Sequence, residues 1–268
     1  MPRPQSSTAE REAPSRPRLG AVAIIPARLQ STRLPEKALQ DLGGAPLVVR
    51  VLERARTIAA LHEVWVATDS ERIAGAVRAA GGRVILTAAE HATGLDRVAD
   101  AAGRLASANG GSPDDVIVNI QGDEPFVSAR GLEHLVRLFE RPEVRMATLG
   151  APFRDLSQVA EPGRVKVVLD RESRALYFSR APIPTGYGPD LAPLLHVGVY
   201  AYRRATLGAL AALPPAPPER AERLEQLRAL WNGIPIHVAV GDYESIGIDT
   251  PEDLARARKL WEERRSAP

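Results

Sequence analysis

The sequence predicts an α/β protein with a mostly parallel central sheet and helices on both of its faces. Three observations lead to this fold class. Short, continuous apolar runs alternate with longer segments whose apolar residues recur every three or four positions. The apolar runs are four or five residues long, as expected for strands buried on both faces. Strands that alternate with helices in this way form parallel βαβ units.

The first half of the chain shows this alternation most clearly. The run at 21–25 contains only apolar residues, and one helical segment ends at Gly81 and Gly82, because glycine readily adopts the backbone conformation that closes a helix. The pattern predicts strands over 21–25, 64–67, 83–86 and 116–120, and helices over 46–58, 71–80 and 94–108.

These strands bring separate polar segments together. In open parallel sheets, ligands bind beyond the carboxyl ends of the strands. We therefore expect the loops after Ile25, Ala67 and Ile120 to meet at one site. Thr68 and Asp69, which directly follow the second strand, belong to the same edge.

The second half of the chain has a less regular pattern. Strands are predicted over 164–169 and 197–202, with a loop rich in Pro and Gly over 182–193 between them. A Pro-rich turn over 214–218 introduces a helix over 219–231. We expect this half to supply a lid over a substrate and a surface for oligomer formation.

Length and composition exclude several classes of protein. The chain has 268 residues, with 35 basic and 33 acidic, and no long basic block, so it lacks the charge pattern of a nucleic-acid-binding protein. Cysteine is absent, which excludes disulfides and Cys-based zinc sites. No apolar run approaches the roughly 20 residues that span a bilayer. Residues 1–18 are polar, with four Pro and four Arg, which predicts a disordered tail. We expect a cytoplasmic protein without membrane insertion.

The loop after the first strand carries a cluster of cations. Arg28, Arg33 and Lys37 lie within it, and Ser31 and Thr32 stand between them. Guanidinium and ammonium groups neutralise phosphate oxygens, and backbone N–H groups in a turn add hydrogen bonds. The spacing of a Walker A loop is missing. Three cations at a strand end favour a triphosphate site over an ordinary exposed basic loop.

Two acidic motifs complement this loop. Asp123 and Glu124 follow the strand at 116–120, where the topology places ligands, although an ordinary acidic turn is the alternative. A carboxylate that faces a phosphate-binding loop implies a bridging cation, and Mg²⁺ prefers one or two carboxylates plus phosphate oxygens. Near the C-terminus, Thr250-Pro-Glu-Asp253 is a helix-capping motif that leaves Asp249 available as a second metal ligand.

Eight motifs then match a known family in order. They are Ile25-Pro-Ala-Arg-x-x-Ser-Thr-Arg-Leu-Pro-x-Lys37, Ala67-Thr-Asp69, Val118-Asn-Ile-Gln-Gly-Asp-Glu-Pro125, Lys166-Val-Val-Leu-Asp170, Ala175-Leu-Tyr-Phe-Ser-Arg180, His196-x-Gly-x-Tyr200, Leu224-Glu-Gln-Leu-Arg228 and Asp249-Thr-Pro-Glu-Asp253. From about Leu19 to Leu260 the chain closely resembles the 3-deoxy-manno-octulosonate (Kdo) cytidylyltransferases, also called CMP-Kdo synthetases.

The resemblance implies a fold and an organisation of the chain. The fold is a Rossmann-like nucleotide-diphospho-sugar transferase fold with a smaller subregion for the lid and for dimerisation. A single nucleotidyltransferase domain is expected over 19–262, with the nucleotide-binding part over about 19–150. The sugar-binding and dimerisation part is expected over about 151–245, and the protein is expected to be a homodimer.

The resemblance also implies roles for individual residues. Catalysis is assigned to Lys37, Arg28, Asp123 and Asp249, of which Asp123 and Asp249 bind Mg²⁺, the expected cofactor. The nucleotide is expected to contact Ala27, Arg28, Ser31, Arg33, Lys37, Thr68, Asp69, Arg97 and Gln121. The sugar acid is expected among Gln121, Arg180, His196, Tyr200, Glu222 and Gln226. Arg180 would pair with the sugar carboxylate, and Glu222 and Gln226 would lie one turn apart on one helix face.

The reaction implied by the resemblance transfers CMP from CTP to an acidic sugar. The anomeric hydroxyl of Kdo attacks the α-phosphorus of CTP, and pyrophosphate leaves, giving CMP-Kdo for lipopolysaccharide biosynthesis. Such chemistry depends on positioning and on neutralisation of charge. The expected partners are therefore CTP and Kdo, without nucleic acid or membrane.

Three features depart from the family pattern. Glu36 stands where the family has Gly, and in Gly94-Leu-Asp-Arg97 Leu95 replaces the usual Thr. The loop between Ile183 and His196 is short. These departures leave open a related sugar acid, such as 8-amino-Kdo or a nonulosonate. A catalytically silent nucleotide-binding relative and a metal-dependent glycosyltransferase are further alternatives, although the second requires an Asp-x-Asp motif that Gln121-Gly-Asp-Glu124 matches poorly.

Overall fold

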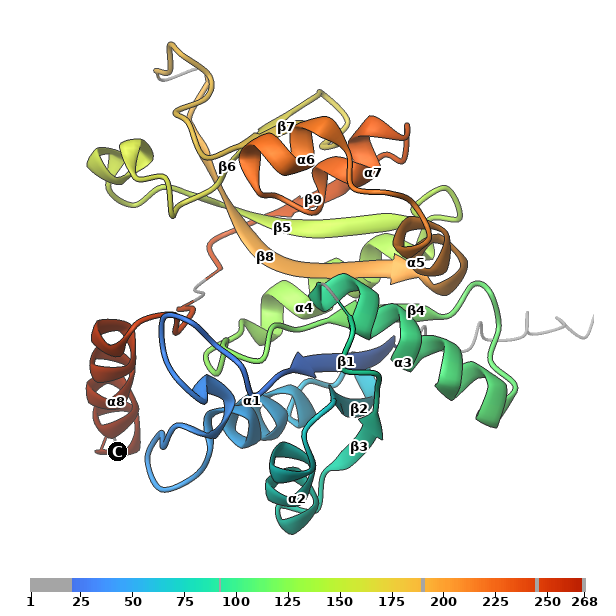
Figure 1. The fold of residues 1–268 in the computed structure, drawn as a ribbon. Coiled ribbons are helices and arrows are strands. Elements are labelled where there is room, and N and C mark those ends of the chain that lie inside the picture. Colours follow the sequence, from blue (N-terminus) through green and yellow to red (C-terminus); the bar gives the residue numbers. More distant parts are fainter. Residues whose placement is uncertain (1–20, 92, 189–190, 244–245, 267–268) are drawn as a thin grey trace, which may run out of the picture.

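A nine-stranded mixed sheet forms the centre of the computed structural model, which describes residues 21–91, 93–188, 191–243 and 246–266 (Figure 1). The predicted tail at 1–18 lies outside the described residues. The strands are β1 (Ala21–Ala27), β2 (Leu61–Thr68), β3 (Arg83–Leu86), β4 (Val116–Asn119), β5 (Met146–Pro152), β6 (Lys166–Leu169), β7 (Ala175–Ser179), β8 (Leu194–Arg203) and β9 (His237–Val240). The main path through the sheet is β3-β2-β1-β4-β8-β5-β9.

The first four strands are parallel, which confirms the prediction. β1 pairs with both β2 and β4, and β2 pairs with β3. The carboxyl ends of β1 and β4 therefore lie side by side. β8 then changes the direction of the sheet, because it pairs antiparallel with β4 and with β5. β9 is parallel to β5, and β6 is antiparallel to β7 and β8.

Helices cover both faces of the sheet. They are α1 (Leu47–Arg56), α2 (Glu71–Ala79), α3 (Gly94–Asn109), α4 (Ala129–Arg137), α5 (Arg204–Ala211), α6 (Pro217–Glu222), α7 (Leu227–Trp231) and α8 (Pro251–Ser266), with short 3-10 turns η1 (Lys37–Leu39), η2 (Leu138–Glu140) and η3 (Leu156–Ala160). Alternate residues of β1 face opposite layers. Ala23 and Ile25 pack in the cluster that contains α1, α2 and α4, whereas Ile24 packs in the cluster that contains α3 and α5.

The predicted helix over 219–231 is wrong, because this segment forms two helices, α6 and α7. Arg223 separates them with a left-handed conformation at φ 55°. The break lets Arg228 reach back to Glu219, with Nη2–Oε1 and Nε–Oε2 distances of 2.6 and 2.9 Å. In one continuous helix these residues, nine positions apart, would point in opposite directions. The helix is thus interrupted, and a buried ion pair forms between its two parts. As a consequence, Glu222 and Gln226 do not share a helix face.

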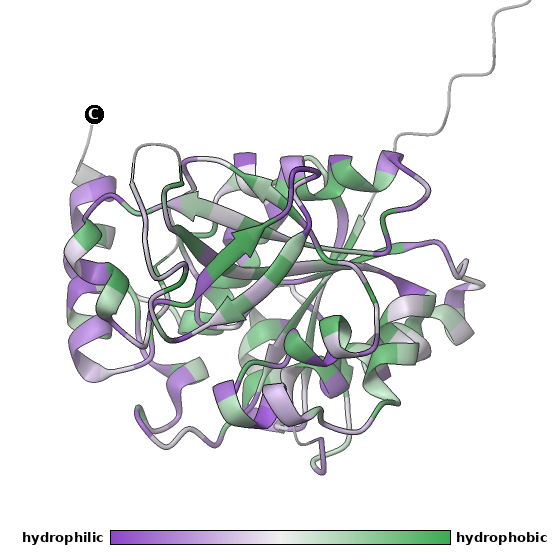
Figure 2. Ribbon diagram, turned by 90° about the horizontal axis from the view of Figure 1, so that it is seen from above, coloured by the Kyte–Doolittle hydropathy of each residue, from purple (hydrophilic) through white to green (hydrophobic). Residues whose placement is uncertain are grey.

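The C-terminal helix α8 begins as predicted. Thr250 Oγ1 accepts a hydrogen bond from Asp253 N at 3.2 Å, and Asp253 Oδ2 accepts from Thr250 N at 3.0 Å. α8 is mostly hydrophilic, in contrast to the central strands (Figure 2). Its few apolar residues pack in a third apolar cluster, the C-terminal cluster, which comprises Leu34, Leu42, Leu47, Phe126, Ile248, Leu254 and Ala257, bordered by Ile246, Leu260 and Trp261. In the part of the chain that the structure describes, no helix is long and apolar enough to cross a membrane.

Candidate active site

A cleft of about 750 Å³ opens at the carboxyl ends of β1 and β4. The loop after β1 forms one wall, and the loop after β4 forms another, so two of the three loops expected at one site meet there. The residues predicted for the site that line the cleft are Ala27, Arg28, Ser31, Arg33, Lys37, Arg97, Gln121, Asp123 and Asp249.

Lys37 joins the two predicted metal ligands. Its Nζ lies 2.5 Å from Asp123 Oδ2 and 2.9 Å from Asp249 Oδ1, although the two aspartates are far apart in the sequence. Arg33 Nη2 adds a contact of 3.0 Å to Asp249 Oδ1. Partial burial opposes the charged form of Lys37, but the two carboxylates outweigh it and raise the pKa of Lys37 above its ordinary value. The ammonium is therefore charged at neutral pH.

Backbone contacts fix the positions of the two aspartates. Gly122 precedes Asp123, and a Cβ on it would lie 2.8 Å from the carbonyl oxygen of Pro26, so only glycine fits between β1 and this loop. Ile248 N donates to Asp123 O at 3.0 Å, which ties the segment before Asp249 to the loop after β4. Asp249 N donates to Asp253 Oδ2 at 3.2 Å. Both carboxylates are thus held by the fold as well as by Lys37.

Glu36 pairs with Arg72 of α2. Both guanidinium Nη atoms contact the carboxylate, with an Nη2–Oε2 distance of 2.9 Å. The hydrogen bond from Arg72 lowers the pKa of Glu36. Glu36 has a φ of 50°, in the left-handed region where glycine is most easily accommodated. The carboxylate is thereby neutralised and the loop after β1 is tied to α2.

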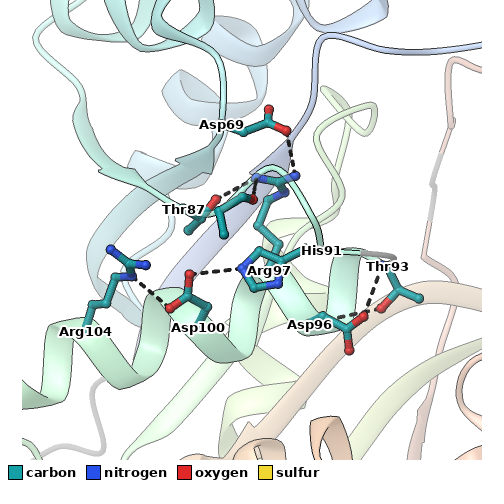
Figure 3. Close-up of polar contacts among 9 residues, drawn as sticks. Asp69, Thr87, His91, Thr93, Asp96, Arg97, Asp100 and Arg104 are labelled. Carbon is teal, nitrogen blue, oxygen red and sulfur yellow. Dashed lines mark hydrogen bonds and ion pairs between the residues drawn. The ribbon is translucent and has the colours of Figure 1, made fainter. Parts of the chain in front are cut away.

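Arg97 is held at the cleft wall by residues that follow β2 and β3 (Figure 3). Its Nη2 lies 3.0 Å from Asp69 Oδ2, and its Nη1 donates to Thr87 Oγ1 at 2.6 Å. Asp69 therefore reaches the site through Arg97. Thr68 is fully buried and accepts a hydrogen bond from Ser70 N, so it does not line the cleft. Leu95, one of the departures from the family pattern, is buried in the core between α3 and the sheet.

The cleft also contains residues that the sequence prediction missed. His91 lines it and is held by Asp100, with an Nε2–Oδ2 distance of 3.0 Å (Figure 3). Thr93 and Gly94 line it at the start of α3, where Thr93 caps the helix. Glu225 lines it from the turn between α6 and α7. The adjacent Glu–Gln pair in the motif at 224–228 was the signal that could have identified Glu225.

Glu222, predicted to contact the sugar, is engaged by β7. Its carboxylate accepts from Ser179 Oγ at 2.6 Å and from Arg180 N at 2.9 Å, and it does not line the cleft. The Arg180 guanidinium donates to three backbone carbonyls, those of Pro162, Glu222 and Arg223. These contacts tie the end of β7 to the break between α6 and α7. Pairing of Arg180 with a sugar carboxylate stays a prediction.

His196 and Tyr200 belong to an aromatic row on β8. The His196 ring lies 5.0 Å from Phe178 and 5.4 Å from Tyr200, and its Nε2 lies 3.0 Å from Thr148 Oγ1. Burial lowers the pKa of His196 to about 3 and raises that of Tyr200 well above its ordinary value, so both are neutral at pH 7. Gln226 is buried with no hydrogen-bond partner for Nε2 among the described residues. None of the three lines the cleft as the structure stands.

Comparison with known proteins gives consistent matches over most of the chain. The model of the family described as cytidylyltransferase matches residues 22–246. A 3-deoxy-manno-octulosonate cytidylyltransferase from Geobacter sulfurreducens is 45% identical over 251 residues, which cover 89% of this chain and 98% of that protein. An 8-amino-3,8-dideoxy-manno-octulosonate cytidylyltransferase from Shewanella halifaxensis is 44% identical over 239 residues, covering 88% and 96%.

Solved structures agree with the sequence matches. A CMP:2-keto-3-deoxy-manno-octonic acid synthetase complexed with CTP superposes with a TM-score of 0.83 at 40% identity, covering 91% of this chain and 99% of that chain. The 4-diphosphocytidyl-2C-methyl-D-erythritol synthase from Anaerococcus prevotii has a TM-score of 0.57 at 13% identity, over the same shares of the two chains. The second match concerns the fold alone.

Proposed function

The chain belongs to the cytidylyltransferase family, and on this premise we propose that it transfers CMP from CTP to the anomeric hydroxyl of Kdo and releases pyrophosphate. The names of two similar proteins support the class of sugar, because both act on eight-carbon manno-octulosonates. The product is an activated sugar acid for lipopolysaccharide biosynthesis.

One observation carries this proposal. A single ammonium group, that of Lys37, contacts Asp123 and Asp249 beside a loop that also carries Arg28 and Arg33. Cations for a triphosphate and paired carboxylates for a cation thus converge at one end of a parallel sheet, where nucleotides bind in such folds. A protein that only bound nucleotide would have no need of the paired carboxylates.

The two carboxylates fit a magnesium ion that also binds phosphate. Because Asp123 and Asp249 both contact Lys37 Nζ, one cation can touch both of them. The described residues contain no group of three or more His, Cys, Asp or Glu side chains that could hold a metal. Mg²⁺ commonly takes one or two carboxylates and completes its shell with water and substrate phosphates. Bound there, Mg²⁺ would neutralise phosphate charge and lower the pKa of the attacking hydroxyl.

The residues of the cleft have separate tasks in this reaction. Arg28 and Arg33 would bind the β- and γ-phosphates and stabilise pyrophosphate as it leaves, since guanidinium groups pair well with phosphate. Lys37 would neutralise charge that develops on the α-phosphate. The sugar hydroxyl gives up its proton to solvent as its oxygen forms the new bond to the α-phosphorus. The bond from the α-phosphorus to the oxygen that it shares with the β-phosphorus breaks, and pyrophosphate leaves.

The 8-amino derivative of Kdo is a second candidate substrate, because one of the similar proteins carries that name at nearly the same identity. The two sugars differ by an amine in place of one hydroxyl. A site that recognises the amine needs a carboxylate or carbonyl acceptor for it, and Glu225 is a carboxylate on the cleft wall that is not in contact with Lys37.

Pyrophosphate release tests the proposal. The protein is incubated with Mg²⁺ and each of the four NTPs, with Kdo, with 8-amino-Kdo or with neither sugar. Release that requires CTP and Kdo supports the proposal, and release only with CTP and 8-amino-Kdo moves the assignment to the second sugar. No release in any combination, from folded protein that binds CTP, would leave a nucleotide-binding protein without this activity.

Asp123→Asn tests the role given to the carboxylates. The amide keeps the size of the side chain but removes its charge, so turnover should fall about a hundredfold or more. CTP affinity, measured by calorimetry, should change much less, because the cationic loop remains. Asp242→Asn is the matched control, since Asp242 is exposed and pairs with Arg154 away from the cleft. Near-normal turnover of Asp123→Asn would remove Asp123 from the metal site.

A further inference from the structure

The C-terminal cluster joins the three segments that carry the charged groups of the cleft. Leu34 lies three residues before Lys37, Phe126 lies three residues after Asp123, and Ile248 directly precedes Asp249. All three are nearly or fully buried, at 5%, 5% and 0% exposed. None of them belongs to either of the two main clusters. The relative positions of Lys37, Asp123 and Asp249 therefore depend on this small core.

Trp261 is the largest residue in contact with this cluster, and it anchors α8. A Cβ on Gly43 would lie 2.3 Å from both Cδ1 and Nε1 of the indole, so the ring lies directly against the backbone of the turn at 41–44. The guanidinium of Arg50 lies 4.6 Å from the centre of the Trp261 ring, and the Phe126 ring lies 6.1 Å away. Figure 1 shows α8 beside the loop that leads into α1.

Polar contacts reinforce the same docking. Arg50 Nε donates to Leu42 O at 2.9 Å and its Nη2 donates to Gly43 O, so the residue that stacks on Trp261 also fixes the turn. Arg258 Nε donates to Asp41 O at 3.0 Å. The turn and the helix are thus held together by an aromatic contact and by cations bound to backbone carbonyls.

A displacement at Trp261 would reach Asp249, because Trp261 lies on α8 and Asp249 lies two residues before the start of this helix. α8 begins at Pro251, ten residues before Trp261, a distance of about 15 Å along a helix. If Trp261 leaves the turn, α8 tilts and the contact between Asp249 and Lys37 opens. An error of about 1 Å in a catalytic site can lower a rate about a hundredfold.

We propose that Trp261 is a positioning residue for the Lys37–Asp123–Asp249 site. By packing on Gly43, Arg50 and Phe126 it holds α8, and through α8 it holds Asp249 next to Lys37 and Asp123. The catalytic consequence rests on the proposed function, whereas the structural consequence does not.

Two neighbouring glycines provide a matched test. Gly43 and Gly44 both have positive φ values, 63° and 87°, so an alanine is strained at either position. An added Cβ clashes with Trp261 only at Gly43, because nothing lies within 4 Å of the Cβ position at Gly44. The difference between Gly43→Ala and Gly44→Ala therefore isolates the contact with Trp261.

The first readout does not require activity. Ile248 N donates to Asp123 O at 3.0 Å and reports whether the Asp249 segment stays on the loop after β4. In Gly43→Ala the Ile248 amide should exchange with deuterium about tenfold faster than in Gly44→Ala. Trp261→Ala should behave like Gly43→Ala, whereas Trp231→Ala, which removes an exposed Trp from α7, should behave like the unaltered chain.

The second readout separates positioning from general destabilisation. At a temperature where all variants are folded, Gly43→Ala and Trp261→Ala should lower kcat about tenfold and raise the Mg²⁺ concentration for half-maximal rate about fivefold. The KM for CTP should change less than about threefold, because the cationic loop stays in place. Trp261→Phe, which keeps an aromatic ring against Gly43 and Arg50, should restore most of kcat.

The outcomes are distinct. Equal Ile248 exchange and equal kinetics in Gly43→Ala and Gly44→Ala would overturn the proposal, as would Trp261→Ala with unchanged Mg²⁺ dependence. Absence of pyrophosphate release from the unaltered chain would reject the proposed function, and the Ile248 exchange would still decide whether Trp261 positions the Asp249 segment. If Trp261→Ala does not fold, the glycine pair and Trp261→Phe give the answer.

Discussion

At the scale of single residues, the cleft is held together by charge. Lys37 lies between Asp123 and Asp249, whose carboxylates would otherwise repel each other. The ion pair of Lys37 and Asp123 is half-buried, because their side chains are 20% and 23% exposed. The ammonium thus stabilises the pair of carboxylates at which a divalent cation is proposed to bind.

Lys37→Met should therefore weaken the fold and make its stability depend on Mg²⁺. Loss of the ammonium should lower the free energy of unfolding by about 1–2 kcal/mol, less than the removal of one partner from a fully buried pair. Added MgCl₂ should raise the melting temperature of Lys37→Met more than that of the unaltered chain, because the cation can bind where the ammonium was. Thermal melts with and without MgCl₂ measure this, and identical responses of the two proteins would contradict it.

His196 should make the fold sensitive to acid. Its pKa is about 3 in the folded protein and about 6.5 in an unfolded chain, so only the unfolded chain takes up a proton as the pH falls through 6.5. Stability is therefore lost as the pH falls from 6.5 toward 3, by up to about 2 kcal/mol between pH 6.5 and 5. His196→Gln should flatten this slope in urea unfolding. His62→Gln, at an exposed position, should leave the slope unchanged. Equal slopes in the unaltered chain and in both variants would contradict the role given to His196.

At the scale of elements, the break between α6 and α7 shows how tertiary contacts override a helical pattern. The buried pair of Glu219 and Arg228 requires the chain to turn back, and Arg223 adopts the left-handed conformation at the turn. Arg223→Gly should stabilise the protein by about 0.5–1 kcal/mol, because glycine adopts this conformation without strain. Arg220→Gly, inside α6, should destabilise it by about 1 kcal/mol. Urea unfolding measures the free energy of unfolding of both variants. A lower value for Arg223→Gly than for the unaltered chain would contradict the claim that Arg223 is strained in its left-handed conformation.

The elements also show what the sequence can and cannot predict. Apolar runs and helical spacing predicted β1 to β4 and α1 to α3, because the apolar residues of each segment recur at the spacing of a strand or a helix. The expectation that all four strands are buried on both faces was wrong for β3, which lies at the edge of the sheet and is exposed at both ends. The cationic loop, Gln121, Asp123 and Asp249 were predicted to share a site, and the topology brings them to one cleft. β5, β7 and β9 were not predicted from the pattern, since their burial depends on partners distant in the sequence.

The prediction that Glu222 and Gln226 share a helix face was wrong for a similar reason. The sequence offered two acidic residues near Gln226, and helical spacing favoured Glu222. The break at Arg223 turns Glu222 toward Ser179 and leaves Glu225 at the cleft. A conformation imposed by a contact between Glu219 and Arg228 is not visible in local spacing.

At the scale of the whole molecule, the sheet continues from the first half of the chain into the second half, where the edge strand β7 carries an apolar rim. β7 pairs with β6 away from the main path, and Leu176 and Tyr177 on β7 are 60% and 38% exposed. Exposed apolar residues at a strand edge are typical of an association surface. We expect a homodimer that uses this rim.

Light scattering should accordingly give a mass about twice the chain mass of 28.9 kDa. Leu176→Asp should shift the mass toward that of a single chain, because a charge in an apolar interface opposes association. Leu86→Asp is the matched control, since Leu86 is an exposed leucine at the end of β3, the opposite edge strand. Equal effects of the two substitutions would place the interface elsewhere.

Because the C-terminal cluster is separate from the two main clusters, α8 and the central sheet should differ in their stability toward heat. Its seven core residues are few beside the two main clusters, and α8 adds little apolar surface to them. Proteins open first where few apolar contacts hold a segment in place. On warming, α8 should therefore detach while the nine-stranded sheet is still intact. Asp249 would leave with it, so heat would inactivate the protein before it unfolds.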